Sequence, residues 1–281
     1  MQYRIINNEI ELRGISDFDP FKIFESGQCF RWNPAPDGSY IGVAKGLAAR
    51  VRCDNGAVYI TGTEKDFNEV WYDYFDLGKN YEELRLQVSR DEYTAAAAEY
   101  GKGIRILAQD RWEALCSFII SQCNNIPRIK KIIEALCRLA GNKIDFMGET
   151  FYSFPDAEVL ACMEPEELAP IRSGYRAPYI IAAARAVASG EADLEAMSCL
   201  DCASALKQLK KMQGVGEKVA NCAVLYGLRI PTAFPVDVWI KRALAEHYPP
   251  DFDPSVFGDA AGLAQQYIYY YIRSSNVSSS D

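Results

Sequence analysis

The sequence contains a single histidine, His247, among 281 residues. This scarcity argues against catalytic triads built on histidine and against histidine-rich metal sites. No run of about 18 or more apolar residues occurs, so we expect no membrane span. The N-terminal segment MQYRIINNEIELR is charged and has no apolar centre, which does not fit a secretory signal. We therefore expect an intracellular protein, cytoplasmic or nucleoid-associated in a bacterium and nuclear in a eukaryote.

The cysteines lack the spacing of a metal site. Nine are scattered along the chain, and Cys199 and Cys202 form a lone CxxC pair. A tetrahedral site would need a second pair or nearby histidines. An odd number of cysteines without a secretory signal also does not fit a disulfide framework. We predict reduced thiols and no metal at the CxxC pair.

The chain carries a formal net charge of −8, which by itself disfavours a polyanionic partner. The positive charge is nevertheless concentrated. Residues 203–245 contain seven Lys or Arg against two acidic residues, and residues 101–142 contain seven against three. These two basic segments are where the motifs described below lie.

The residue pattern predicts an α+β fold, in which an N-terminal antiparallel β-sheet domain precedes an α-helical body. Segments rich in aromatic and β-branched residues, separated by turn sequences such as NPAPDGS, predict strands near 3–6, 8–13, 28–33, 39–44, 48–53 and 57–61. From about residue 95 the apolar residues recur at helical spacing, as in WEALCSFIISQ and PRIKKIIEALCRLAG. We predict a β-rich domain over 1–95, a helical region over 96–273 and a disordered polar tail over 274–281.

The segment LKKMQGVGEKVA predicts a helix, a tight hairpin and a second helix. Gly214 and Gly216 can adopt positive φ or let another backbone approach closely. The second helix begins near Gly216, and its free N–H groups form an anion site that suits a DNA phosphate. A plain helical corner remains the alternative. Lys218 lies in the first helical turn, where the positive helix end disfavours the ammonium form and so favours a nucleophilic amine.

A second motif, AFPVDVW, places Asp237 just before the helix-like run VWIKRAL. Asp237 is well placed to cap that helix. A capping carboxylate whose other oxygen faces a substrate can also stabilise developing positive charge.

Taken together, LKKMQGVGEKVANCAVLYGL and AFPVDVWI resemble the helix-hairpin-helix DNA glycosylase superfamily. SGQCFRW, FIISQCNNIPRI, SGYRAPYI and GLAQQYIYYY narrow the resemblance to the 8-oxoguanine DNA glycosylase/lyase family. These segments span most of the chain in the family's order. The resemblance implies a β-sheet domain packed on a helix-hairpin-helix body, and excision of 8-oxoguanine opposite cytosine from duplex DNA after the base is flipped out.

The resemblance assigns the chemistry to two residues. Lys218 corresponds to the nucleophile that attacks C1′ of the deoxyribose and forms a Schiff base, whose β-elimination nicks the strand. Asp237 corresponds to the carboxylate that stabilises the positive charge on the sugar. The covalent adduct requires no external cofactor. No cysteine follows Cys222, so the iron–sulfur cluster of the endonuclease III branch is not expected.

The resemblance also assigns the base pocket. The carbonyl of Gly27 corresponds to the acceptor for the N7 hydrogen that only the oxidised base carries. Cys222 lies on one face of the flipped base, and Tyr269 replaces the aromatic residue, usually phenylalanine, that stacks on it. Gln265 reads the Watson–Crick edge of the base. Pro235 is also assigned to base recognition.

The resemblance also assigns residues that contact the DNA strand opposite the lesion. Arg128 and Arg176 correspond to residues that hold the orphaned cytosine, and Tyr175 corresponds to the wedge beside the lesion. The family's strand-filling asparagine is replaced by Cys123, so a neighbouring asparagine fills the gap or the discrimination for cytosine is weaker. Those neighbours are Asn124 and Asn125.

Contacts to the DNA backbone are expected from the hairpin residues Gly214, Val215 and Gly216. Trp239 stands where the family has a phosphate-contacting histidine, and its indole N–H can donate one hydrogen bond but carries no charge. The resemblance further implies a monovalent cation at the backbone carbonyls of Lys210, Met212 and Val215. We expect a monomer that binds double-stranded DNA containing 8-oxoguanine.

Two other functions remain open at this point. One is a glycosylase for another lesion, such as alkylated purines, although those enzymes usually lack the hairpin lysine. The other is a non-catalytic helix-hairpin-helix module, which needs the hairpin glycines but has no use for Lys218 with Asp237. Loss of chemistry on substitution of these two residues separates the enzyme from the binding module.

Overall fold

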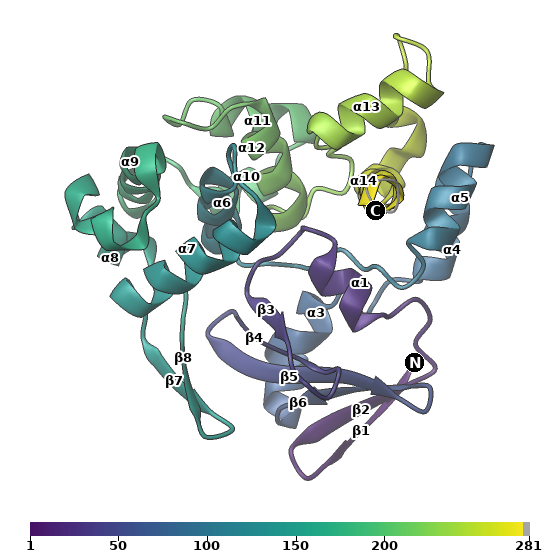
Figure 1. Ribbon diagram of the computed structural model, residues 1–281, viewed down its shortest axis with the longest axis horizontal. Helices are drawn as coiled ribbons and strands as arrows, with labels where there is room; N and C mark the ends of the chain where they lie inside the picture. Colours follow the sequence, from purple (N-terminus) through teal and green to yellow (C-terminus); the bar gives the residue numbers. More distant parts are fainter. Residues whose placement is uncertain (278–281) are drawn as a thin grey trace. The chain divides into compact units, whose positions relative to one another are not determined.

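The computed structural model describes residues 1–277 (Figure 1). The chain divides into two compact units. The first unit comprises Met1–Gln28, Val51–Ala108 and Pro231–Asp281, and the second comprises Cys29–Arg50 and Gln109–Ile230. Both units are discontinuous in sequence, and the division at residue 95 stays a prediction. The α+β class, with an N-terminal antiparallel sheet followed by a helical body, is confirmed.

The sheet has six strands in the order β1-β2-β6-β5-β4-β3. Neighbours such as Ile10 and Ile60 pair in antiparallel register, and both side chains are buried. β5 runs through the boundary between the two units. The strands are β1 (Gln2–Ile6), β2 (Glu9–Arg13), β3 (Trp32–Pro34), β4 (Tyr40–Ala44), β5 (Leu47–Asp54) and β6 (Ala57–Thr61).

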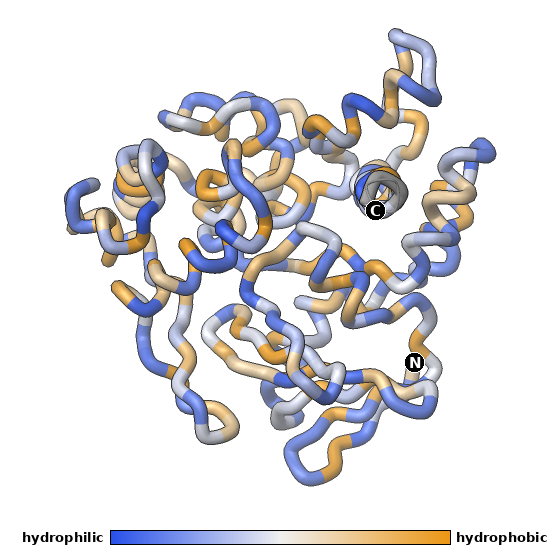
Figure 2. Tube along the Cα trace, in the orientation of Figure 1, coloured by the Kyte–Doolittle hydropathy of each residue, from blue (hydrophilic) through white to orange (hydrophobic). Residues whose placement is uncertain are grey.

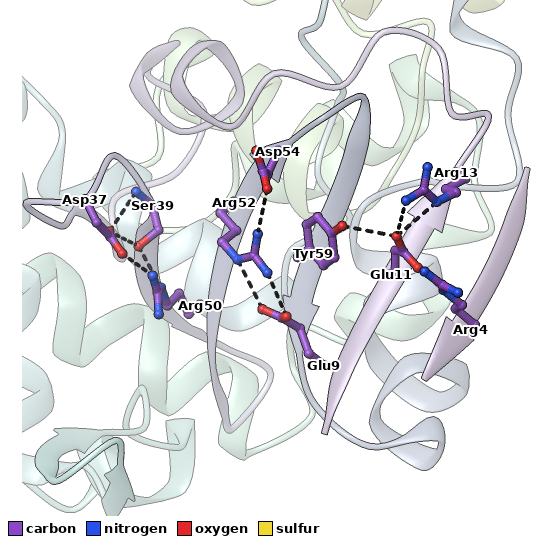
Figure 3. Close-up of polar contacts among 10 residues, drawn as sticks. All are labelled: Arg4, Glu9, Glu11, Arg13, Asp37, Ser39, Arg50, Arg52, Asp54 and Tyr59. Atoms are coloured by element: carbon purple, nitrogen blue, oxygen red, sulfur yellow. Dashed lines mark hydrogen bonds and ion pairs between the residues drawn. The ribbon is translucent and has the colours of Figure 1, made fainter. Parts of the chain in front are cut away.

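Charged side chains tie the strands of the first unit together (Figure 3). Glu11 on β2 is only 3% exposed and accepts hydrogen bonds from Arg4, Arg13 and the hydroxyl of Tyr59. The hydrogen bond from Arg4, followed by those from Arg13 and Tyr59, lowers the pKa of Glu11 to about 2. This carboxylate therefore stays ionised at neutral pH and links β1 to β2.

The predicted strand over 28–33 is wrong for its first four residues, because β3 begins only at Trp32. Helix α1 (Pro20–Glu25), which the sequence reading missed, precedes this segment with Asp19 as its N-cap and Pro20 in its first turn. The buried Gln28 side chain then replaces strand pairing: its amide donates to the carbonyls of Ile23 and Arg105, and its Oε1 accepts from Leu107 N–H. These bonds hold the segment as an irregular bend.

The helices between residues 81 and 100 and those between residues 238 and 277 share an apolar core. Its buried members include Tyr81, Phe257 and Tyr267. Residues 64–74 form three consecutive helical pieces. Helix α14 continues to Val277, four residues into the predicted polar tail, and the rest of that tail lies outside the described residues. The helices are α2 (Glu64–Asp66), η1 (Phe67–Trp71), α3 (Tyr72–Tyr74), α4 (Tyr81–Val88), α5 (Glu92–Tyr100), α13 (Val238–His247), η5 (Pro254–Ala260) and α14 (Ala261–Val277).

Arg105 is a large charged side chain buried in the first unit, with 1% of its surface exposed. Its guanidinium donates five hydrogen bonds to backbone carbonyls and lies 4.0 Å from the Tyr81 ring centroid. We expect Arg105→Met to lower the free energy of unfolding by about 3–5 kcal/mol, because it leaves those carbonyls unpaired. Urea denaturation would measure this loss, and Lys102→Met, at an exposed lysine of the same unit, is the control. Equal effects of the two substitutions would contradict the prediction.

The second unit is mainly helical. Helix α6 packs on η4, where Phe118 stacks on Tyr226 with ring centroids 5.3 Å apart. Figure 2 shows orange apolar and blue polar stretches alternating along the helical trace, as helices with one buried face require. Among the described helices, none combines the length and apolar character needed to cross a membrane. The helices are α6 (Arg111–Ile120), α7 (Ile126–Ala140), α8 (Ala157–Ala161), η2 (Pro165–Ile171), η3 (Gly174–Arg176), α9 (Ala177–Ala188), α10 (Leu194–Ser198), α11 (Cys202–Leu209), α12 (Glu217–Cys222) and η4 (Ala223–Gly227). A small hairpin of β7 (Lys143–Phe146) and β8 (Glu149–Tyr152) projects from these helices (Figure 1).

Candidate active site

The turn between α11 and α12 forms the hairpin that the glycine spacing predicted. Gly214 has φ +78°, and a Cβ at this position would lie 2.3 Å from Cγ of Tyr179. Only glycine satisfies both conditions. Gly216 does not adopt the positive φ that was considered for it: it caps α12 with φ −84° and ψ −178°. No heavy atom lies within 4 Å of a Cβ built there, so this end of α12 is open.

Lys218 lies in the first turn of α12 and is half-buried. Its Nζ donates to Oγ of Ser121 at 3.0 Å and sits 5.1 Å from the ring centroid of Phe118. The Ser121 hydroxyl in turn donates to the carbonyl of Phe118 at 2.8 Å. This arrangement leaves the serine oxygen as the acceptor and fixes the direction of the amine.

The charges around the start of α12 partly cancel. Lys210 forms an ion pair with Glu217, with 2.7 Å between Nζ and Oε2. Glu217 also accepts a hydrogen bond from the side chain of Asn221. Glu217 therefore offsets the positive charge of Lys210 near the start of α12.

Asp237 caps α13, as predicted, in the first unit. Its Oδ1 accepts from the N–H groups of Trp239 at 3.0 Å and Ile240 at 2.9 Å. Among the described residues nothing donates to Oδ2. The carboxylate thus holds the start of the helix through one oxygen. Pro235 just before it is buried, and Trp239 just after it is half-buried.

Gly27 and Tyr269, also in the first unit, lie against each other. Gly27 has φ +80°, and a Cβ there would lie 3.2 Å from both Cε1 and the hydroxyl of Tyr269. Gln266 Nε2 donates to the carbonyl of Ser26 at 2.7 Å, which fixes the turn before Gly27 against α14. Gln265 is buried on the same helix. The structure thus brings Gly27 to α14, the helix that carries Gln265 and Tyr269.

In the second unit, Arg176 organises the loop after α6. It is 2% exposed, and its guanidinium donates to the carbonyls of Gln122, Cys123 and Ser173. The Tyr175 ring stacks on this guanidinium at 4.4 Å, and the side chain of Tyr175 is 53% exposed. Arg176 therefore fixes the loop backbone, whereas Tyr175 presents an aromatic face to solvent.

The two asparagines of this loop are engaged by nearby backbone. Asn125 caps α7 by accepting from the N–H of Arg128 at 3.0 Å. Asn124 accepts from the N–H of Asn125 and donates to the carbonyl of Ile120. Cys123 precedes them with φ +47° and is exposed. The side chain of Arg128 is exposed at the start of α7.

Nearly the whole chain matches known DNA repair proteins in sequence and structure. Residues 12–115 match the N-terminal domain of 8-oxoguanine DNA glycosylase, and residues 116–255 match the HhH-GPD superfamily of base excision DNA repair proteins. The structure of MBOgg1 in complex with a low-affinity DNA ligand is 42% identical with a TM-score of 0.93, covering 98% of this chain and 100% of that one. The chain belongs to the 8-oxoguanine DNA glycosylase family.

Two other relatives agree with this family. The Clostridium acetobutylicum 8-oxoguanine glycosylase/lyase, solved with double-stranded DNA containing cytosine opposite 8-oxoguanine, is 35% identical with a TM-score of 0.93 over 98% of this chain and 99% of that one. A probable N-glycosylase/DNA lyase from Methanothermobacter thermautotrophicus is 29% identical, covering 94% of this chain and 96% of the relative. The resemblance drawn from the sequence motifs is confirmed.

Three side chains that position the family's motif residues were missed in the sequence. Ser121 orients Lys218, Gln266 holds the turn at Gly27, and Gln28 fixes the bend after it. Each bond joins segments far apart in sequence, for which no local pattern exists. Cys222 was predicted, and it is buried on α12 one turn after Lys218.

No side-chain metal site is found within residues 1–277: no group of three or more His, Cys, Asp or Glu could hold an ion. A cation at the hairpin would use backbone carbonyls instead. The carbonyl of Met212 already accepts from the N–H of Val215 at 3.1 Å. Since a carbonyl oxygen has two lone pairs, this bond is compatible with a cation, which stays a proposal.

Proposed function

We propose that this protein excises 8-oxoguanine opposite cytosine from duplex DNA and then cleaves the strand by β-elimination. The observation that carries the proposal is the amine of Lys218, held by Ser121 at the start of α12 beside the open Gly216. The identity of 35% to the Clostridium glycosylase/lyase over almost the full length supports the same substrate.

The hairpin supports the docking of DNA. The open N-terminus of α12 offers backbone N–H groups to a phosphate, and no side chain of its own caps it. Because phosphate contacts release counterions, the affinity for duplex DNA should fall steeply as the salt concentration rises. The target nucleotide leaves the stack before reaction, since C1′ is inaccessible within the duplex.

The chemistry follows from a neutral amine. Lys218 Nζ attacks C1′ while the N-glycosidic bond breaks, and the base leaves with the bonding electrons and takes up a proton. Loss of the amine proton and opening of the sugar give a Schiff base between Nζ and C1′. Removal of a proton from C2′ then expels the 3′-phosphate. Asp237, through its uncommitted Oδ2, stabilises the positive charge that develops on the sugar.

Recognition of the lesion is proposed to rest on one hydrogen bond. The carbonyl of Gly27 accepts the N7 hydrogen of 8-oxoguanine and repels the lone pair of guanine. Tyr269 on α14 is proposed to stack on the base, Gln265 on the same helix to read its Watson–Crick edge, and Cys222 on α12 to contact a face of the base. No external cofactor enters these steps.

Borohydride trapping tests this function directly. The wild-type protein should form a covalent adduct with duplexes containing 8-oxoguanine, most strongly opposite cytosine, and none with undamaged duplex. Adducts that are equally strong with an alkylated purine would point to another lesion. Absence of any adduct together with tight binding would require a free-base release assay, which separates a monofunctional glycosylase from a binding module.

The backbone conformation at Cys123 predicts that substitution by asparagine stabilises the protein. Its φ of +47° is unfavourable for cysteine, whereas asparagine tolerates this region. We expect Cys123→Asn to raise the free energy of unfolding by about 0.5–1 kcal/mol and to sharpen the preference for cytosine over adenine opposite the lesion. Thermal unfolding and excision rates on the two duplexes would measure both effects. Cys162→Asn, at another exposed cysteine, is the control, and an unchanged cytosine preference in Cys123→Asn would contradict the gap-filling role.

A further inference from the structure

A pocket of about 370 Å³ opens in the second unit between the bend before β3 and helix α7. It contains four cationic residues and one acidic residue, in a chain whose net charge is −8. None of these residues takes part in the chemistry proposed for Lys218. The lining includes Phe30, Arg31, Lys130, Lys131, Glu134 and Arg138.

Arg31 is a buried cation with incomplete pairing. Its side chain is 5% exposed, and its Nη2 donates to the carbonyl of Tyr152. Its Nη1 has no hydrogen-bond partner within the described part of the chain and lies 3.9 Å from Oε1 of Glu113. Burying a guanidinium is unfavourable unless its charge is balanced. An anion in the adjoining pocket would supply that balance.

Glu113 balances Arg31 only in part. Burial raises the pKa of Glu113 to about 7, against the opposing effect of Arg31. A sizeable fraction of this carboxyl is therefore protonated at neutral pH. Glu113 is therefore an incomplete counter-charge for Arg31, which lines the pocket.

The other cations lie on one face of α7. Lys130 Nζ donates to the carbonyl of Trp32 at 2.9 Å, and Arg138 pairs with Glu134 at 3.0 Å. Lys131 is exposed and forms no hydrogen bond or ion pair with the rest of the described chain. Lys131 and Arg138 are thus the exposed cations of the lining, while Arg31 is its buried cation.

We propose that this pocket binds a small phosphate-bearing molecule, with a nucleoside monophosphate as the representative class. Lys131 and Arg138 contact the phosphate, and Phe30 and the alkyl stems of the cationic side chains provide apolar surface beside it. The volume lies within the range of small-molecule sites, which favours a small ligand over a passing DNA backbone.

Calorimetric titration at low salt tests the proposal, with pyrophosphate and deoxyguanosine monophosphate as probes. The variant is Lys131→Gln with Arg138→Gln. The control is Lys143→Gln with Lys207→Gln, which removes the same charge from the same unit outside the pocket. We expect the wild type and the control to bind both probes. The affinity of the pocket variant for each probe should be lower by at least about tenfold. Excision of 8-oxoguanine without the probes should be unchanged in both variants.

Two results would overturn the proposal. If the pocket variant and the control lose the same affinity for the probes, the probes are attracted only by the general positive charge of the surface. Loss of affinity for undamaged duplex in the pocket variant, with no binding of either probe to the wild type, would assign the cations to the DNA backbone. Circular dichroism of both variants establishes that the fold is retained. Since excision by Lys218 is measured separately, failure of this proposal leaves the proposed function untouched.

Discussion

Lys218→Gln is expected to abolish the borohydride-trapped adduct and to reduce strand cleavage at 8-oxoguanine by on the order of 10⁴-fold. Glutamine keeps an N–H donor on a side chain one atom shorter, but its amide nitrogen is not nucleophilic. The half-buried position of Lys218 and its single bond to Ser121 predict that the fold tolerates this change. Trapping followed by denaturing electrophoresis measures the adduct and the cleaved strand in one experiment.

Binding must be followed in parallel, because the prediction separates chemistry from docking. The Lys218→Gln protein should retain its affinity for lesion-containing duplex to within a few-fold, since the hairpin backbone is unchanged. Lys207→Gln, on the exposed face of α11, is the matched control and should keep full trapping. An adduct of normal yield in the Lys218→Gln protein would assign the nucleophile to another amine.

Ser121→Ala refines the same experiment. It removes the acceptor that directs the Lys218 amine but leaves the nucleophile in place. A positioning role therefore predicts slower trapping with an unchanged final yield. Rescue by Ser121→Thr, which restores a hydroxyl, would distinguish positioning from a general loss of packing.

The parts of the molecule that local chemistry determines were predictable. The positive φ of Gly214, the capping role of Asp237 and the helical face of α7 each depend on residues within one or two turns. The family's motif order then supplied the roles of Lys218 and Gly27, which no spacing argument could give.

The remainder depends on contacts between distant segments. The Lys218–Ser121 bond spans 97 residues and the Gln266–Ser26 bond spans 240. The apparent strand at 28–33 has β-like composition, yet the buried amide of Gln28 binds backbone groups of Ile23, Arg105 and Leu107 and prevents pairing. Tertiary hydrogen bonds of this kind override the intrinsic strand preference.

Gly214→Ala is expected to damage the hairpin severely. The new methyl group would meet the Tyr179 ring 2.3 Å from Cγ, near the rigid base of that side chain, and alanine disfavours the φ of +78°. We expect a loss of about 2–4 kcal/mol in the free energy of unfolding and a matching fall in affinity for duplex DNA. Chemical denaturation and fluorescence anisotropy would measure the two quantities.

A double-mutant cycle with Tyr179→Ala identifies the cause of that loss. Removing the ring relieves the clash but leaves the backbone strain, so the pair should be less destabilised than the sum of the single changes by about 1–2 kcal/mol. Gly216→Ala is the internal control: its φ of −84° suits alanine and no atom lies within 4 Å of the new methyl group, so only the poorer N-cap counts and stability should fall by no more than about 1 kcal/mol. If Gly216→Ala nevertheless weakens DNA binding, the open end of α12 is the place where a phosphate approaches. If it weakens neither stability nor binding, phosphate docking at this helix end is contradicted, while the steric account of Gly214 still holds.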